Sequence, residues 1–420
     1  MPRKKNTSRL IMLLGTIVAF VAIVLKFTIL EHDLRRDQPL FTHHSGLQFA
    51  GSKSCQSCHE DIYRDHQFSS HHLSSRLASR DNILGDFSAP GNKVRINDRM
   101  VVEMVASDTG LYQVAQLQTP SGEEMKYRHF DITVGSGKEG QSYLYWKKDF
   151  LYQLPVSYHT RSGSWINSPG YKRDSVYFAR PIRGACLECH TTSFTNLPHP
   201  TLSNAYEKEQ LFLGIECERC HGPAWEHVEF HQRNPFEEES KHLIDISALS
   251  RQQRLDACGL CHSGLRVYAN QSYDFLTGDS LSNYGYQVAK SVSENKMDVH
   301  GNQYGLLTAS KCFIQSPEMD CGSCHNPHQQ ERGQLPLFSR RCQSCHQQVH
   351  FEDDIASKLE RETIETNCID CHMPELPSDD LVYQLNDSSG IEPALVRTHL
   401  IAIYPEEANK LVEHLRNITR

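Results

Sequence analysis

The sequence lacks the local motifs of several common catalytic classes. It contains no phosphate-binding glycine loop, no serine-hydrolase elbow and no HExxH pattern. It also lacks an excess of positive charge, because 51 acidic residues outnumber 43 basic residues and the formal net charge is −8. An acidic chain is poorly suited to a polyanion, so we expect no nucleic-acid partner.

Cysteine is abundant, and its distribution is highly regular. The pattern C-x-x-C-H occurs seven times, at Cys55–His59, Cys186–His190, Cys217–His221, Cys258–His262, Cys321–His325, Cys342–His346 and Cys368–His372. These motifs contain fourteen of the fifteen cysteines: Cys55, Cys58, Cys186, Cys189, Cys217, Cys220, Cys258, Cys261, Cys321, Cys324, Cys342, Cys345, Cys368 and Cys371. The remaining residue, Cys312, is expected to be a small buried hydrophobe, with a haem-facing thiol or an intermolecular disulfide as alternatives.

The pattern C-x-x-C-H is typical of c-type haem attachment, in which both thiols bind the porphyrin covalently. The histidine then becomes the proximal iron ligand, which predicts seven proximal ligands: His59, His190, His221, His262, His325, His346 and His372. Structural zinc would need paired C-x-x-C units, and seven is odd. Disulfides would not require histidine. We therefore expect seven covalently bound c-type haems, each with one iron.

The N-terminus has a basic flank followed by an apolar run. Residues 1–9 form a basic tail that we expect to be cytoplasmic, and residues 10–30 are long enough to cross a membrane as a helix. A cleaved signal peptide is the alternative, although Ile29-Leu30-Glu31-His32 offers no small-x-small cleavage site. The expected localisation is the inner (cytoplasmic) membrane, with a single-pass helix and the haem domain on the periplasmic side. Residues 31–50 then form a tether.

The spacing of the motifs divides the remaining chain. We expect a first haem segment at 51–90, a β-rich insert at 91–180, a six-haem region at 181–378 and a C-terminal segment at 379–420. Short β-rich runs separated by glycine-containing turns fill the insert: Met100–Ser107, Leu111–Gln118, Met125–Val134, Ser142–Lys147 and Phe150–Tyr158. The predicted fold class is mostly short α-helices and loops packed around covalently bound haems. To these it adds an inserted antiparallel β-rich subdomain and one N-terminal transmembrane helix.

The second axial ligand of each iron decides whether a haem carries electrons or binds a substrate. Histidine should dominate, because 17 of the 24 histidines lie outside the motifs and methionine occurs only eight times. Some candidates follow a motif so closely that they should serve a neighbouring haem, whereas others lie far from any motif. Together the candidates are His71, His227, His300, His328, His350 and His399, with His72, His129, His159, His199, His231 and His242 in reserve.

Several stretches resemble a family of multihaem c cytochromes. This family is related to the tetrahaem cytochrome of ammonia oxidisers and to hydroxylamine oxidoreductase. CQSCHEDIYRDHQFSSHH is similar to its CxxCHxxxYxxWxxSxH helix, with His71 at the SxH position and His66 in place of tryptophan. IECERCHGPAWEHV resembles its CHGPGxxH segment, which implies that His227 is an axial ligand. VHGNQYGLLTASKCF and DCGSCHNPH resemble a related segment, which supports His300 and His328.

Two functions suit this pattern, and the sequence leaves the choice between them open. The favoured one is a membrane-anchored heptahaem cytochrome that transfers electrons between a membrane donor and a periplasmic or outer-membrane acceptor. The alternative is a reductase or oxidoreductase of a small nitrogen or sulfur compound at one five-coordinate haem. A sensor or scaffold subunit is a third hypothesis. The expected partners are redox proteins, and the membrane through residues 10–30, while the sequence does not predict an oligomeric state.

Overall fold

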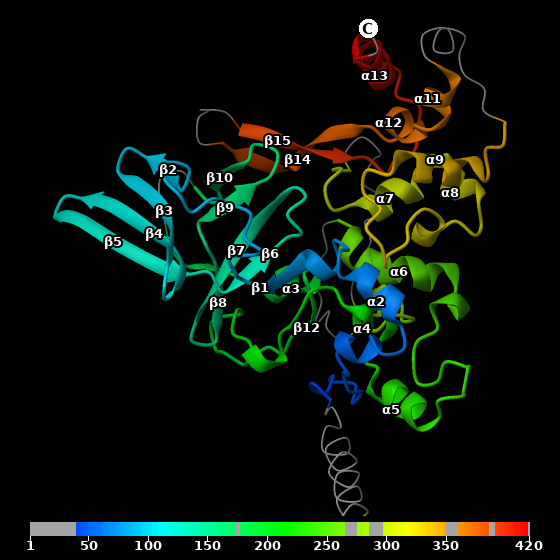
Figure 1. Cartoon of the computed structure of the whole chain (residues 1–420), viewed down its shortest axis with the longest axis horizontal. Coiled ribbons are helices and arrows are strands. Elements are labelled where there is room, and N and C mark those ends of the chain that lie inside the picture. Colours follow the sequence, from blue (N-terminus) through cyan, green and yellow to red (C-terminus); the bar gives the residue numbers. More distant parts are fainter. Residues whose placement is uncertain are drawn as a thin grey trace, which may run out of the picture.

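The computed structural model describes residues 39–172, 177–264, 275–284, 297–348, 360–385 and 391–418. The described chain has a strand-rich half and a half of short helices and loops, side by side in Figure 1. Strands β2 to β10 build the first half, and helices α2 and α4 to α9 build the second. Most C-x-x-C-H motifs lie in the second half.

The strand-rich half begins with a four-stranded antiparallel meander. Its strands are β2 (Lys93–Asn97), β3 (Met100–Ser107), β4 (Gly110–Thr119) and β5 (Gly122–His129). Gly110 and Gly122 begin the last two strands with positive φ angles of 136° and 124°, a backbone conformation that glycine adopts without steric cost. Alternate residues point inward along β2 and β3, which is the periodicity expected of a half-buried strand.

A larger antiparallel sheet follows, in the order β1-β6-β7-β9-β10-β14-β15, with β8 paired to β7 and β11 paired to β8. Its strands are β1 (Ser75–Leu77), β6 (Ile132–Val134), β7 (Gly140–Lys147), β8 (Phe150–Gln153), β9 (Val156–His159), β10 (Ser164–Asn167), β11 (Arg180–Pro181), β14 (Glu375–Gln384) and β15 (Ile391–Arg397). A separate pair joins β12 (Thr191–Ser193) to β13 (Phe212–Leu213).

The main hydrophobic core lies between the meander and the larger sheet. Val102 and Met104 of β3 are fully buried against Phe130, Tyr143 and Trp165. Each fully buried aromatic side chain of this kind contributes about 1.5–3 kcal/mol relative to an exposed one. The core therefore explains why this half can fold around its own side chains.

A buried amide ties the two sheets together. Gln113 of β4 donates to the Val156 carbonyl at 2.8 Å and accepts from the Val156 amide at 3.0 Å. Both groups of this fully buried side chain are therefore satisfied.

The second half consists of short helices: α2 (Glu60–His66), α3 (Gly184–Glu188), α4 (Cys217–His221), α5 (Trp225–Arg233), α6 (Arg251–His262), α7 (Gln303–Thr308), α8 (Lys311–Gln315), α9 (Leu335–Gln343), α11 (Arg361–Glu365), α12 (Cys368–His372) and α13 (Pro405–Ile418). Several bury no side chain, including α5, α8 and α11. Ser250 and Gln253 form a capping box that begins α6. In contrast to the strands, most of these helices are not organised around an extensive apolar core of their own.

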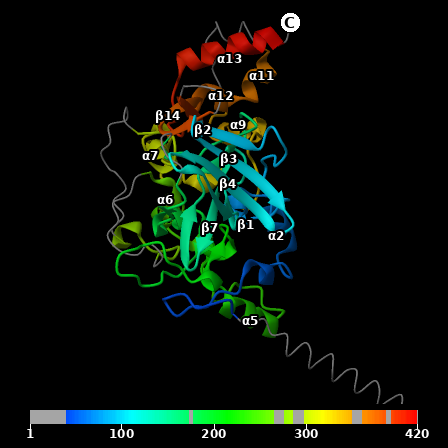
Figure 2. The ribbon, with the colours of Figure 1, turned by 90° about the vertical axis from the view of Figure 1, so that its left-hand side faces the viewer.

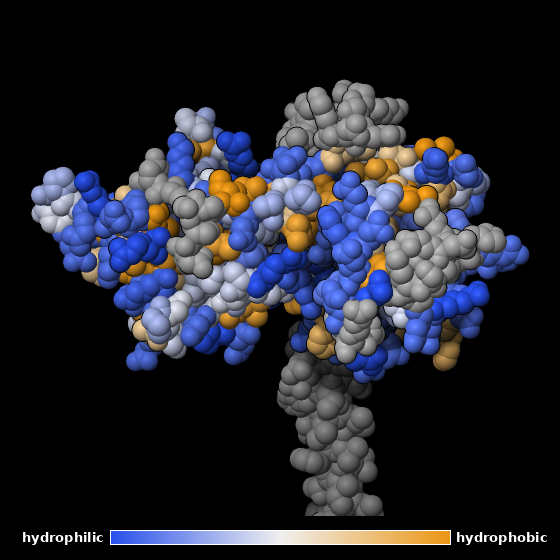
Figure 3. Space-filling view, turned by 90° about the horizontal axis from the view of Figure 1, so that it is seen from above, coloured by the Kyte–Doolittle hydropathy of each residue, from blue (hydrophilic) through white to orange (hydrophobic). Residues whose placement is uncertain are grey.

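The C-terminal region connects the two halves. The β14–β15 hairpin pairs with β10 through Asn167 and Gln384, and its other end leads to α12 and α13. Figure 2 shows α13 lying across one end of the molecule, with α5 at the opposite end. On the face seen in Figure 3, hydrophobic residues form small separate groups among hydrophilic ones.

The predicted fold class is wrong in its emphasis on helices and loops. Large antiparallel sheets form, and strands also occur outside the expected insert, as β1 before residue 91 and as β14 and β15 after residue 374. The sequence of β14, ELPSDDLVYQ, has no clean alternation, and its strand pairs mainly with β15 and at a single residue with β10. The positions of the insert boundaries, residues 91 and 180, remain predictions.

The predicted transmembrane helix is also not upheld. No helix in the described ranges is long and apolar enough to cross a membrane. The segment on which the prediction rested, residues 10–30, lies outside the described residues.

Candidate haem-binding sites

The C-x-x-C-H motifs adopt tight helical turns. The third and seventh motifs coincide with α4 and α12, and the fourth forms the last turn of α6. In the fifth motif, the side chain of Asp320 caps the turn that begins at Cys321. No disulfide joins any of the cysteines in the described residues. Each described motif therefore presents two thiols and one imidazole within five residues, as a covalently attached haem requires.

Three motif histidines face a second imidazole from a distant segment. His221 lies opposite His328, with ring centres 6.1 Å apart and planes only 13° from parallel. His325 lies opposite His399 at 6.2 Å and 30°.

The third pair is His262 and His71, whose ring centres are 6.4 Å apart and whose planes cross at 71°. Two metal–imidazole bonds of about 2 Å each place ring centres roughly 6 Å apart. All three separations therefore fit an iron between the two rings.

Backbone carbonyls fix the orientation of two further candidate ligand rings, those of His227 and His372. Nδ1 of His227 lies 2.8 Å from the Lys241 carbonyl oxygen, and Nδ1 of His372 lies 2.9 Å from that of Ala402. Because a carbonyl oxygen can only accept, Nδ1–H donates and the lone pair stays on Nε2. Metal-bound histidines are commonly oriented in this way.

His227 lies near the first motif. Burial is the main cause that lowers the pKa of His227, the Lys241 carbonyl acts in the opposite direction, and the charges of His231 and His59 lower it further. His227 lies on α5, six residues after His221, the last residue of the third motif. A residue that follows one motif is thus brought next to the histidine of another.

Other candidates are not brought into such a pair. His300 is exposed, and His350 lies outside the described residues. Within the described ranges, no ring pair of this kind involves His190, His346 or His372. Burial lowers the pKa of His190 against the opposing effect of Ser74.

Cysteines from different motifs approach one another. Cys55 and Cys217 lie close enough for each to shift the other's pKa, which is lowered to about 7 for Cys217 and raised for Cys55. Cys258 and Cys321 are related in the same way, and Cys220 is also close enough to raise the pKa of Cys258.

The sixth and seventh motifs continue this series. Burial, reinforced by the nearby Cys368 and Cys324, raises the pKa of Cys342 to about 11. Cys261 lies 3.7 Å from the Glu188 carbonyl oxygen inside the second motif. The motifs are therefore electrostatic neighbours in the order one, three, four, five, six, seven, and the second motif touches the fourth.

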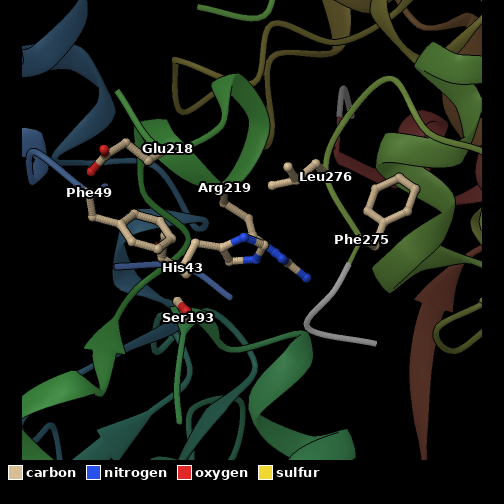
Figure 4. A pocket seen from close by; sticks show the side chains of 8 residues that line it. His43, Phe49, Ser193, Glu218, Arg219, Phe275 and Leu276 are labelled. Carbon is tan, nitrogen blue, oxygen red and sulfur yellow. The ribbon is translucent and has the colours of Figure 1, made fainter. Parts of the chain in front are cut away.

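A small pocket lies beside the second and third motifs. Figure 4 shows the His43 ring between Phe49 and Arg219. The residues that line it are His43, Phe49, Thr192, Ser193, Glu218, Arg219, Phe275 and Leu276.

Glu218 joins two backbone segments beside this pocket. Its buried carboxylate accepts the amides of Ala50, Gly51 and Ala224 at 2.7–2.8 Å. It thereby joins the chain before the first motif to the loop after the third. Sequence reasoning missed Glu218, because acceptance by backbone amides leaves no pattern in the sequence.

The comparisons with known proteins agree with this chemistry. A family model described as cytochrome c554 and c-prime matches residues 172–222, which contain the second and third motifs. Among solved structures, the outer cell wall cytochrome OcwA is similar with a TM-score of 0.52 and 15% sequence identity. That match covers 88% of this chain and 86% of the other chain. No curated protein matches, and no comparison bears on the resemblance to hydroxylamine oxidoreductase.

The prediction of an inner-membrane, single-pass protein is not upheld, because no helix in the described ranges is long and apolar enough to cross a membrane. The donor set itself fits haem, since each cysteine pair is followed by a histidine, and three of these histidines lie beside a second imidazole. Together these observations support a multihaem c-type cytochrome with covalently bound haem and a role in electron transfer.

Proposed function

We propose that this protein carries seven covalently attached haems and passes electrons between two redox partner proteins. The observation that carries the proposal is the succession of neighbouring motifs, from the first to the third and onward to the seventh, whose cysteines lie close enough to shift one another's pKa. Separate sites scattered over a scaffold would not be neighbours in this way. When bound, haem supplies one-electron chemistry at its iron.

The opposed histidines are proposed as axial pairs: His59 with His227, His221 with His328, His262 with His71, and His325 with His399. Each pair joins a motif to a segment remote in sequence, so the ligands also hold the fold together. Two histidine ligands keep an iron six-coordinate. His300 and His350 stay candidates for the remaining irons.

The protein side chains limit rearrangement around each iron. The thioether bonds fix two edges of the porphyrin, and carbonyl-bonded imidazoles such as His227 cannot rotate without losing a hydrogen bond worth about 1 kcal/mol. A rigid ligand set changes little between oxidation states, which favours rapid electron transfer.

Two measurements test the haem count and the role. Pyridine haemochrome absorbance and intact mass should both give seven haems per chain. Fewer than six would contradict our interpretation of the repeats. Dithionite should reduce all haems, and a small soluble redox protein should reoxidise them. A protein whose haems exchange electrons with no redox protein would contradict the electron-transfer role.

A second candidate function rests on the second motif. Within the described chain, His190 is half-buried and is not part of an opposed ring pair. An open distal side there would allow a small nitrogen or sulfur compound to bind. The ferric EPR spectrum decides between the two: a high-spin signal lost in a Cys186→Ala, Cys189→Ala variant supports this candidate, whereas a fully low-spin spectrum excludes it.

A further inference from the structure

Three ionisable side chains meet at a place that the proposed axial pairs do not use. His66 ends α2, His72 lies six residues later, and Glu216 immediately precedes α4. The side chains of His66 and Glu216 are only 8% and 7% exposed, and that of His72 is 27% exposed. Three segments thus converge on one largely buried polar cluster.

Only one of the two close pairs in this cluster forms a hydrogen bond. Nδ1 of His72 lies 2.6 Å from Oε1 of Glu216, a normal hydrogen bond. Nδ1 of His66 and Oε2 of Glu216 are 4.0 Å apart, and neither has a hydrogen-bond partner among the described residues. Leaving a buried polar atom unsatisfied costs about 1–3 kcal/mol, so two such atoms facing each other require an explanation.

The separation suits an intervening metal ion. A direct hydrogen bond would need a distance of about 2.7–3.2 Å. Two ligand atoms bonded at about 2.0–2.2 Å to one tetrahedral metal lie roughly 3.4 Å apart, so a side-chain shift of about 0.6 Å brings the His66 nitrogen and the Glu216 oxygen to that spacing. One ligand atom from each of the three residues lies within 4.8 Å of the others, so small side-chain movements bring all three to one centre.

We propose that His66, His72 and Glu216 form a binding site for one divalent transition metal ion of the zinc type, separate from the haem irons. Two imidazoles and one carboxylate are ligands that zinc accepts, with a fourth position left for water. The site is independent of the number of haems and of the electron-transfer role.

The protonation states agree with this assignment. Burial lowers the pKa of His66 to about 4, so its imidazole is neutral near pH 7. Although burial acts to raise the pKa of Glu216, the hydrogen bond from His72 is the main cause that keeps it below its usual value. A neutral imidazole and an ionised carboxylate are the forms that bind metals. His66 also stands where the resembled helix pattern has tryptophan, so the ligand is a departure of this chain.

Metal analysis of the holoprotein tests the site. The purified protein is treated with a chelator, dialysed against zinc chloride and analysed for zinc per chain by mass spectrometry. We expect one zinc per wild-type chain. We expect His66→Gln and Glu216→Gln to weaken binding at least tenfold, since even outer-shell changes cost about 10–100-fold in affinity.

The matched control is His242→Gln, because His242 and Glu226 form a 3.5 Å pair that is half-exposed or more. This variant should keep its zinc. The haem absorbance spectrum verifies that each variant folds, and His66→Trp provides a bulky replacement if His66→Gln does not.

X-ray absorption at the zinc edge should show nitrogen and oxygen ligands without sulfur. The proposal would be overturned by sulfur ligands in this spectrum or by a wild-type protein that contains no zinc. It would equally be overturned if both His66→Gln and Glu216→Gln retained their zinc.

Discussion

At the scale of single residues, pairs of imidazoles define the candidate iron sites. His328 and His399 come from loops, yet their ring centres lie 6.1 and 6.2 Å from those of the motif histidines His221 and His325. Burial, reinforced by the positive charge of His325, lowers the pKa of His399 to about 4. The His399 ring is therefore neutral at physiological pH, as an iron ligand must be.

Replacing His399 should open one iron. In His399→Leu, His325 keeps its position but loses the opposing ring, so one haem per chain should become high-spin. Ferric EPR and the absorbance band of high-spin haem measure the change. His129→Leu, at a partly exposed position on β5, should leave both spectra as in the wild type. An unchanged spin state in His399→Leu would show that another group ligates this iron.

The relative orientation of paired rings should be visible in the same spectra. The planes of His71 and His262 cross at 71°, whereas those of His221 and His328 differ by 13°. Crossed planes leave the iron orbitals that interact with the imidazoles nearly equal in energy, and parallel planes separate them. His71→Leu should therefore remove a low-spin signal with a large maximal g value, and His328→Leu a rhombic signal. The reverse assignment would contradict these pairs.

At the scale of elements, one ion pair holds the loop that presents His328. Arg341 of α9 donates to both carboxylate oxygens of Glu331, at 2.6 and 2.7 Å, and to the Cys324 carbonyl at 2.8 Å. Glu331 also accepts the Asn326 amide at 3.0 Å. The loop after the fifth motif is thereby fixed to the helix that carries the sixth.

This ion pair should make stability depend on pH. The Arg341 hydrogen bond is the main cause that holds the pKa of Glu331 below its usual value, so the pair stabilises the fold above the unfolded pKa of about 4.3. Its contribution is lost as the pH falls through the lower pKa of the folded state. Glu331→Gln should lose about 1.5–3 kcal/mol of unfolding free energy at pH 7, with a shrinking difference below pH 4.

Urea midpoints measured between pH 3 and pH 7 test this expectation. Glu139→Gln is the control, because Glu139 and its partner Arg332 form a pair at 2.9 Å that is about half exposed. The control should shift the midpoint less at every pH. A difference between wild type and Glu331→Gln that stays constant down to pH 3 would assign the effect to packing instead.

At the scale of the whole molecule, local sequence patterns predict which residues form the sites. They do not predict how the sites are arranged in space. The five-residue motifs predict the haem-binding thiols and proximal histidines, because that chemistry depends on neighbours in the chain. The pairing of His71 with His262 does not follow from spacing, since 191 positions separate them and only the folded chain brings them together. The β14–β15 hairpin escaped prediction for another reason, because the sequence of β14 has no clean alternation of polar and apolar residues.

The order of contacts between motifs predicts what happens when one site is removed. The fifth motif lies between the fourth and the sixth, whereas the second touches the fourth from the side. In Cys321→Ala, Cys324→Ala, electrons added by a small pulse of reductant should redistribute in two phases, because the sixth and seventh sites are cut off. In Cys186→Ala, Cys189→Ala, redistribution should stay as fast as in the wild type. Stopped-flow absorbance measures both, and equal slowing in the two variants would show that electron transfer does not follow the contact order.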